Sequence, residues 1–416
     1  MRHRALALPI TGPFGVRDLH LKRRLLAILV CLALPLVAAP AIPAPVAAVR
    51  EANADPRLPP AEVNAVPIAL LVDLSSGQVL YAKQANRRFL PASVTKVMTL
   101  YTAFDLMGRK QISPSQRYRM SEQAFKQWHR VGSTMFLDRS MAPSVHDLLL
   151  GIANISANDG CIVLAEGAAG SVPTWVALMN AEAGKLGMRD SHFGTPNGWM
   201  DEGQTYVTAH DLATLAAAIL AEHPDDYHRY IGHETMTWNG ITQHNHDPIL
   251  GHLEGADGIK TGFTNQAGYN FLGSAERNGR RLVMVIAGAD RPADRAKAAK
   301  ALMDWGFAAF SNKPLFKAGE TIGSARVQGG GATKVSLVMP SGFTASIPKD
   351  AADKTSLKIV YNGPITAPIQ QGTIVASLEI RTGDGEPHRI PLIAGESVAQ
   401  AGLLARLRNG LLGLVT

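Results

Sequence analysis

The chain has 416 residues, of which 46% are hydrophobic and 18% are charged, and these proportions are ordinary for a globular protein large enough for two domains. The net charge is +7, but residues 1–41 alone contribute +5 of it through six basic residues and one acidic residue. The rest of the chain is nearly neutral, so its charge gives no case for a nucleic-acid partner.

Residues 1–41 have the pattern of a secretory signal peptide. Basic residues end at positions 22–24 (KRR), an apolar run follows, and residues 39–41 (APA) fit a small-residue cleavage site. The alternative is an uncleaved membrane anchor, which Pro35 and the short apolar run disfavour. We therefore expect the protein to be exported. Cleavage would remove Cys31 and leave Cys161 as the single cysteine, so no disulfide within one chain is expected.

The chain then divides by composition. Residues 42–62 are rich in alanine and proline and are typical of a linker. Residues 63–312 mix helical and strand patterns, which predicts an α/β catalytic domain. The expected elements are two strands around the turn at 75–77, helices at 145–156 and 209–223, a buried strand at 280–289 and a helix at 294–310.

Short alternating runs such as TKVSLVMP and TIVASLEIR predict a small all-β sandwich domain over residues 313–395. Residues 396–416 are predicted to form an amphipathic helix. Its leucines at 403, 404, 407, 411 and 414 share one face. Residues 400–416 could then contact the inner-membrane surface. The alternative is a helix packed on its own domain or a frayed end, since Gly410 and Gly413 weaken a helix.

The stretch PASVTKVMT places Ser93 three residues before Lys96, and residues three apart share one face of a helix. Pro91 sits where a helix would start, so Ser93 would lie near an N-terminus that favours a developing anion. Apolar neighbours such as Val97 would desolvate Lys96 and lower its pKa toward the neutral amine. A neutral amine can take the proton of a serine hydroxyl, but the pair alone is weak evidence.

Two further stretches carry polar groups that would suit a cleft. ISANDG places Ser156 and Asn158 two residues apart, just after a predicted helix; alone it could be a turn or a helix cap. DGIKTGFTN places Lys260, Thr261 and Gly262 in a predicted strand. Lys260 and Thr261 could bind a carboxylate, and Gly262 would let another backbone approach closely.

Ser-x-x-Lys, Ser-x-Asn and Lys-Thr-Gly, in this order, are the motifs of penicillin-binding proteins and class A β-lactamases. The sequence resembles the low-molecular-mass penicillin-binding proteins, the serine-type D-alanyl-D-alanine carboxypeptidases. The likeness continues through GSTMFL, LGMRDSHFGTPNGW, TAHDLATLA and WGF, from about residue 66 to residue 310. It is weaker in the β-rich region, and the tail is similar to the family's membrane-anchoring helix.

The resemblance implies a penicillin-binding fold, an antiparallel sheet flanked by helices, followed by the β-sandwich domain. It implies a periplasmic enzyme that removes the terminal D-alanine from peptidoglycan stem pentapeptides and is acylated by β-lactam antibiotics. No metal or organic cofactor is implied. The resemblance implies that Ser93 is the nucleophile, that Lys96 is its base, and that Ser156 and Asn158 complete the site. It implies that Lys260, Thr261 and Arg295 bind the substrate carboxylate, and that the backbone N–H groups of Ser93 and Phe263 stabilise the oxyanion. The substrate would lie beside the strand of residues 260–264, which includes Gly262 and Thr264.

The sequence departs from the family pattern at Ala157, where many members have glycine, and at Phe263, where some have histidine. Four alternatives compete with this function, and only the first is left undecided. A D,D-endopeptidase acting on cross-linked peptidoglycan would use the same chemistry. A β-lactamase needs a further glutamate stretch, which is missing between Asn158 and Lys260. A zinc enzyme would rest on His244 and His246 with Asp247, but a third and a fourth ligand are not evident. A catalytically dead wall-binding protein is disfavoured by the intact Ser93, Lys96 and Lys260.

Overall fold

The computed structural model describes residues 58–349, 355–382 and 387–402. The first region is built on a five-stranded sheet in the order β2-β1-β7-β6-β5, with every neighbouring pair antiparallel. This arrangement confirms the predicted antiparallel sheet and leaves β5 at one edge. The strands are β1 (Ile68–Asp73), β2 (Gln78–Lys83), β5 (Ala256–Thr264), β6 (Gly268–Arg277) and β7 (Arg280–Ala289).

The central strands are apolar because they are covered on both faces. All six residues of β1 are buried, and so are six consecutive residues of β7. β6 and β7 are joined by Asn278 and Gly279, with φ of 52° and 74°. Two successive positive φ values are what a tight two-residue hairpin turn requires, and Asn-Gly supplies them at low cost. The predicted strand at 280–289 is therefore confirmed.

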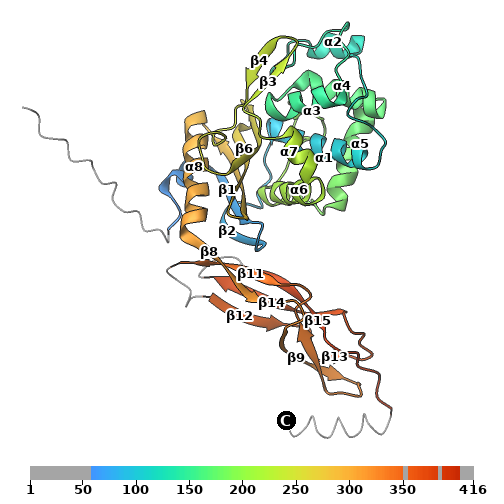
Figure 1. Ribbon diagram of the computed structural model, residues 1–416, viewed down its shortest axis with the longest axis vertical. Helices are drawn as coiled ribbons and strands as arrows, with labels where there is room; N and C mark the ends of the chain where they lie inside the picture. The colour runs from blue at the N-terminus through green and yellow to red at the C-terminus, as the bar shows by residue number, and fades with distance from the viewer. Residues whose placement is uncertain (1–57, 350–354, 383–386, 403–416) are drawn as a thin grey trace, which may run out of the picture. The chain divides into compact units, whose positions relative to one another are not determined.

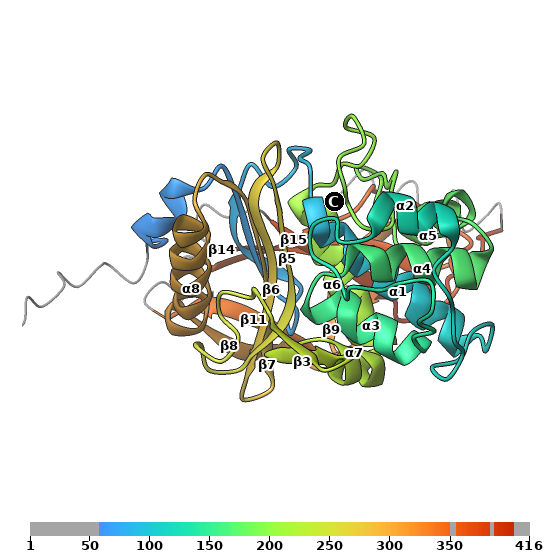
Figure 2. The same ribbon diagram turned by 90° about the horizontal axis from the view of Figure 1, so that it is seen from above.

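Helices cover both faces of this sheet. Figure 2 shows α8 on one face and the helices from α1 to α7 on the other. The predicted helices at 145–156, 209–223 and 294–310 are confirmed as α3, α6 and α8. The helices are α1 (Lys96–Gly108), α2 (Glu122–Trp128), α3 (Val145–Asn154), α4 (Asn158–Ala169), α5 (Val172–Lys185), α6 (Ala209–Glu222), α7 (Pro224–Tyr230) and α8 (Pro292–Ala309).

Local signals in the sequence set where these helices begin. Ser144 and Asp147 form a capping box at the start of α3, and the Thr208 hydroxyl accepts from the backbone N–H of Asp211 at the start of α6. Within the described ranges, no single helix is long and apolar enough to cross a bilayer. α4 and α5 reach that length and composition only as a pair, bent by 89°.

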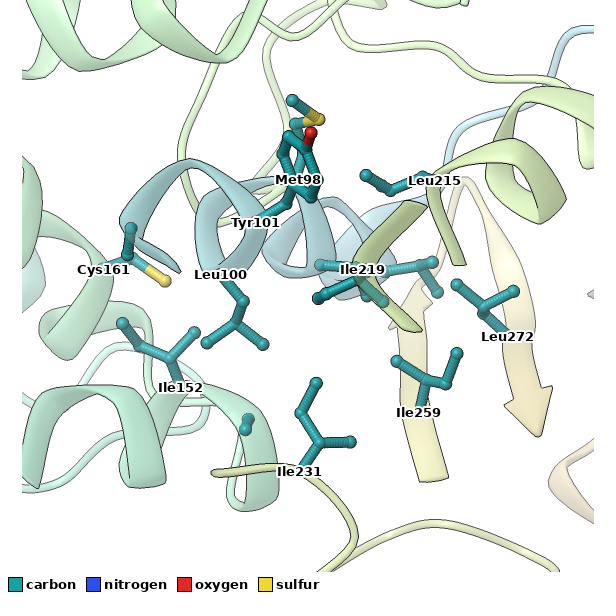
Figure 3. Close-up of a cluster of buried hydrophobic side chains, with 14 of the residues drawn as sticks. Met98, Leu100, Tyr101, Ile152, Cys161, Leu215, Ile219, Ile231, Ile259 and Leu272 are labelled. Carbon is teal, nitrogen blue, oxygen red and sulfur yellow. The ribbon is translucent and has the colours of Figure 1, made fainter. Parts of the chain in front are cut away.

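The core of this region surrounds α1, which is buried on nearly all sides. Figure 3 shows how apolar side chains from several helices and from β5 and β6 meet there, with Leu100 of α1 among Ile152, Ile219 and Ile259. A helix that is apolar all round belongs in the interior of a protein. This packing holds the N-terminus of α1, and with it the Ser-x-x-Lys motif, against β5.

The strands after α8 form the second region, drawn in orange to red in Figure 1. Six strands lie in the order β12-β14-β15-β10-β9-β13, and β8 pairs with β11. They enclose a hydrophobic core of their own. The strands are β8 (Phe310–Phe316), β9 (Thr321–Gln328), β10 (Lys334–Val338), β11 (Phe343–Pro348), β12 (Thr355–Val360), β13 (Ile365–Thr366), β14 (Ile374–Thr382) and β15 (His388–Ala394).

The C-terminal segment differs from the prediction where it can be compared. Residues 396–402 are not helical. Val398 pairs with Ile369, and the backbone N–H of Ala401 donates to the carbonyl of Gly329 at 2.8 Å. The helix expected from residue 396 therefore does not begin there, because these residues complete the pairing of the β-rich region. The leucine-rich residues 403–416, the predicted signal peptide and most of the predicted linker lie outside the described residues.

A buried ion pair within the first region, Asp73–Arg280, also accepts a hydrogen bond from Ser346 of the second region and should contribute to stability. Asp73 is fully buried, and its carboxylate accepts from Arg280 Nε at 2.7 Å, from the Ser346 hydroxyl at 2.5 Å and from the backbone N–H of Ser75 at 2.9 Å. Asp73→Ala would leave the guanidinium of Arg280 buried and unpaired. We expect a loss of about 3–5 kcal/mol in the free energy of unfolding, measured by urea denaturation.

A matched control removes an ion pair that is exposed to solvent on the protein surface. Glu122 and Lys126 on α2 form a pair whose side chains are 59% and 71% exposed. Glu122→Ala should change the free energy of unfolding by about 0.5 kcal/mol or less. Equal losses for the two variants would contradict a structural role for Asp73.

Candidate active site

Ser93 and Lys96 come together at the start of the central helix. Ser93 lies in a short 3-10 turn (Ala92–Thr95), and Lys96 is the first residue of α1. Their spacing brings Lys96 Nζ to 2.7 Å from Ser93 Oγ. The contact predicted from the sequence spacing is therefore present.

Three oxygens surround the amine of Lys96, which has no exposed surface. They are Ser93 Oγ at 2.7 Å, Asn158 Oδ1 at 2.8 Å and the backbone carbonyl of Asn197 at 2.7 Å. The two carbonyl oxygens can only accept. A neutral amine has two hydrogens and one lone pair, so both hydrogens go to the carbonyls and the lone pair faces the Ser93 hydroxyl. The geometry fits a base that removes the Ser93 proton.

Burial also favours the neutral form of this amine. Desolvation lowers the pKa of Lys96 from 10.5 to about 8, although the nearby Cys161 and Asp159 oppose the shift. At neutral pH a useful fraction of the amine is therefore unprotonated, as a general base requires.

Ser156 and Asn158 lie where α3 gives way to α4. Ser156 has a φ of 63° and is buried, and Asn158 begins α4. The Asn158 side chain is used at both ends: Oδ1 accepts from Lys96, and Nδ2 donates to the carbonyl of Val131 at 3.1 Å. Its backbone N–H donates to Ser133 at 2.8 Å. The motif therefore orients Lys96 and holds the segment that borders the cleft.

β5 carries Lys260, Thr261 and Gly262 past the Ser93 turn. A Cβ atom at Gly262 would meet the carbonyl of Pro91 and the backbone nitrogens of Val94 and Ser93, which shows how closely the strand approaches. Desolvation, together with the charge of Lys96, lowers the pKa of the buried Lys260 from 10.5 to about 7. The expected close approach of another backbone at Gly262 is confirmed.

These residues face one cleft of about 650 Å³. Lys96 and Lys260 lie buried behind its wall. At the rim, the ring of Phe263 is 46% exposed and stacks on Tyr269 with 4.1 Å between centroids. The predicted site residues that line the cleft are Ser93, Ser156, Asn158, Thr261, Gly262, Phe263, Thr264 and Arg295.

One end of the cleft carries the positive charge of Arg295. Arg295 of α8 lines it, with its guanidinium 5.8 Å from the centroid of Tyr269 and 3.4 Å from the carbonyl of His246. Burial lowers the pKa of His246, and the charges of Lys260 and Arg295 lower it further. This end suits a ligand carboxylate. Within the described ranges, no group of three or more histidine, cysteine or acidic side chains is placed to hold a metal ion, so the zinc alternative gains no support.

The sequence did not reveal the part played by residues 195–200. The carbonyl of Asn197 holds Lys96, and Trp199 and Met200 form a wall of the cleft. The signal that could have pointed here is Gly198, with a φ of 70°, where a Cβ would meet the carbonyl of Ala92. That glycine lets this loop pass close to the turn that carries Ser93.

Comparison with known proteins identifies two domain families. The family model described as D-alanyl-D-alanine carboxypeptidase matches residues 54–291, and the model for the C-terminal domain of penicillin-binding protein 5 matches residues 310–400. D-alanyl-D-alanine carboxypeptidase DacD of Salmonella typhimurium is 35% identical over 348 residues, which are 82% of this chain and 88% of that relative.

Solved structures agree with the sequence comparison. Penicillin-binding protein 5 from Haemophilus influenzae superimposes with a TM-score of 0.70 at 30% identity, covering 81% of this chain and 98% of that one. Penicillin-binding protein D2 of Listeria monocytogenes, in its ampicillin-bound form, gives 0.51 at 28% identity, covering 58% and 97%. The predicted fold is thereby confirmed. Matches of this length, over a cleft that the three motifs build together, place the chain in the D-alanyl-D-alanine carboxypeptidase family.

Proposed function

We propose that Ser93 is the nucleophile with which this serine carboxypeptidase removes the terminal D-alanine of a peptidoglycan stem pentapeptide. The observation that carries the assignment is the amine of Lys96, whose two carbonyl acceptors leave its lone pair for the Ser93 hydroxyl. Ser93 Oγ attacks the carbonyl of the penultimate residue while its proton passes to Lys96. The proton then moves to the nitrogen of the departing D-alanine.

Water completes the reaction. It attacks the acyl-enzyme ester, gives a proton to Lys96, and the shortened peptide leaves as Ser93 regains its proton. The backbone N–H groups of Ser93 and Phe263 are proposed to stabilise the oxyanion of both steps. Ser156, which lines the cleft, is proposed to relay protons.

The substrate is proposed to bind as an added strand. β5 is the edge strand of its sheet, so an extended peptide can pair with the backbone of residues 260–264. Its terminal carboxylate would lie at the positive end, with Lys260, Thr261 and Arg295 as partners. A β-lactam carries a carboxylate and a reactive carbonyl in a similar arrangement, which fits the ampicillin-bound form of the Listeria relative.

The family relationship places this reaction in the bacterial cell envelope. We propose the periplasm as the compartment, on the basis of the signal pattern in residues 1–41. We further propose that the leucine face of residues 403–416 contacts the inner-membrane surface. Both segments lie outside the described residues. The division into a catalytic domain up to residue 312 and a β domain after it also stays a proposal.

Labelled penicillin tests the nucleophile. The mature protein should form a covalent adduct on the peptide that contains Ser93, and Ser93→Ala should abolish it while the protein melts at the same temperature. The same variant should release no D-alanine from a stem pentapeptide. Mass spectrometry of the digested adduct identifies the labelled residue. An adduct that persists on another serine in Ser93→Ala would overturn the assignment.

A further inference from the structure

A second cavity, of about 640 Å³, lies next to the cleft and shares no lining residue with it. We call it the side pocket. It is bounded by α2, α4, the start of α5 and residues 195–197. Nothing in the proposed reaction uses it. Its polar lining nevertheless has features of a binding site rather than of a packing gap.

Two buried polar atoms in the side pocket lack hydrogen-bond partners among the described residues. One is Nδ2 of Asn197, whose side chain has no exposed surface. The other is Oε2 of Glu166, while its Oε1 accepts from the Ser121 hydroxyl at 3.2 Å. Leaving a buried polar atom unpaired costs free energy, so two of them in one cavity indicate a ligand that satisfies both.

The two atoms require opposite partners. A glutamate carboxylate only accepts, so its partner must be a donor, and an ammonium group is the strongest. The amide Nδ2 only donates, so its partner must be an acceptor such as a carboxylate oxygen. Arg119 also lines the pocket, and so does Ser171 at the N-terminus of α5, where a helix favours an anion. The lining thus matches a group with an ammonium and a carboxylate together.

The side pocket is also connected to the catalytic machinery. The backbone carbonyl of Asn197 accepts from Lys96 Nζ, and its side-chain Oδ1 accepts from the backbone N–H of Trp199 at 3.0 Å. Trp199 lines the cleft, and Trp128 of the side pocket meets it edge-on with 5.8 Å between ring centroids. A ligand on Asn197 would therefore touch the residue that orients the base.

We propose that the side pocket binds the zwitterionic end of an amino acid, with its ammonium group on Glu166 and its carboxylate on Asn197 and Arg119. This inference rests on the proposed function, because the proposed reaction brings two possible sources of such a group to the protein. One is the side chain of a diamino acid in the stem peptide, when that side chain ends in both charges. The other is the D-alanine that the reaction releases.

Binding can be measured on the full-length mature protein carrying Ser93→Ala, so that peptides are not consumed. Isothermal titration calorimetry would compare a pentapeptide containing meso-diaminopimelate, the same peptide with Nε-acetyl-lysine at that position, and free D-alanine. The diaminopimelate peptide should bind at least about tenfold more tightly than the acetyl-lysine peptide, as expected for a charge-assisted contact. Adding Glu166→Gln should abolish the difference, whereas Glu122→Gln, on exposed α2 surface, should leave it.

The arms of this experiment separate the two sources. If the two peptides bind alike but free D-alanine binds in a way that Glu166→Gln abolishes, the pocket takes the released product. If Glu166→Gln changes none of the three affinities in a folded protein, the pocket holds only water and the proposal is wrong. Should Glu166→Gln fail to fold, Arg119→Gln, at an exposed position, tests the carboxylate end with the same readout.

Failure of this inference is distinguishable from failure of the proposed function. With Ser93 intact, D-alanine release from diacetyl-L-lysyl-D-alanyl-D-alanine, which has no zwitterionic side chain, should stay within about twofold of the wild type in Glu166→Gln. If the wild type releases none, the proposed function is wrong whatever the calorimetry shows. If release is normal and Glu166→Gln changes no affinity, only the side-pocket proposal falls.

Discussion

Lys96→Arg is expected to lower the second-order rate of Ser93 acylation by a β-lactam by about 10²–10⁴-fold. An arginine keeps the positive charge but stays protonated, so it has no lone pair to offer the Ser93 hydroxyl. The fold should survive, because the guanidinium can still donate to the Asn158 and Asn197 oxygens that now bind the amine. Stopped-flow or quench-flow labelling measures the rate, and circular dichroism checks the fold.

Lys185→Arg is the matched control, since Lys185 is an exposed lysine on α5 that pairs with Glu182. In the Lys185→Arg variant, Ser93 should be acylated at the wild-type rate. A Lys96→Arg protein that acylates within a few-fold of wild type would show that another group takes the Ser93 proton.

The same amine sets the pH dependence of acylation. The active form has Lys96 neutral, and its pKa is lowered to about 8, so the rate should fall as pH drops through this value. Desolvation by burial is the largest cause of this shift, and Lys260→Gln leaves Lys96 buried, so the acid limb should stay nearly where it is. A limb that Lys260→Gln moves by about one pH unit or more would show instead that the charge of Lys260 sets the pKa of Lys96.

Gly262→Ala is expected to lower acylation by about 100-fold or more. The new Cβ would meet the carbonyl of Pro91 and would lie 3.1 Å from the backbone nitrogen of Ser93 and 3.0 Å from that of Val94. These are backbone atoms of the turn that carries Ser93, the proposed nucleophile, so either the turn or β5 must move. Such a shift would misplace the proposed oxyanion donor on Ser93, and losing one donor costs about 10²–10³-fold in other serine enzymes.

Gly184→Ala provides the comparison for this variant. Gly184 lies in α5, and a Cβ there meets no atom within 4 Å. It should keep wild-type acylation and gain up to about 1 kcal/mol in the free energy of unfolding, because alanine is the better helix former. Both variants are measured by the rate of penicillin labelling. Wild-type acylation in Gly262→Ala would show that the close approach of β5 is not needed.

Much of the site could be predicted because its chemistry follows from side chains at short spacing. Ser93 and Lys96 lie three residues apart at a helix start, so local geometry alone brings them together. The strand pattern of the sequence predicted that Lys260 and Gly262 lie on one strand. The close approach of another backbone at Gly262 was predicted because glycine has no Cβ atom. The resemblance then joined three motifs that no local rule could bring into one cleft.

The parts that sequence reasoning missed depend on backbone groups and distant neighbours. Asn197 binds Lys96 through its backbone carbonyl. Every residue type has this group, so the sequence contains no signal for the contact. The start of the tail was misjudged for a similar reason. Residues 396–402 carry no strong strand signal, and their pairing is decided by Ile369 and Gly329, which are far away in sequence.

The strand order of the catalytic sheet also determines when the enzyme can first act. β1, made before Ser93, pairs with β7, made long after it, and β5 supplies the wall against which the Ser93 turn rests. Pairings between such distant segments form late, because a long loop must close first. A partial chain that contains Ser93 and Lys96 but not β5 and β7 therefore has the proposed nucleophile and base without the proposed substrate strand. Penicillin labelling should thus appear only once residues 280–289 are present and paired, so the antibiotic reports the assembled five-stranded sheet.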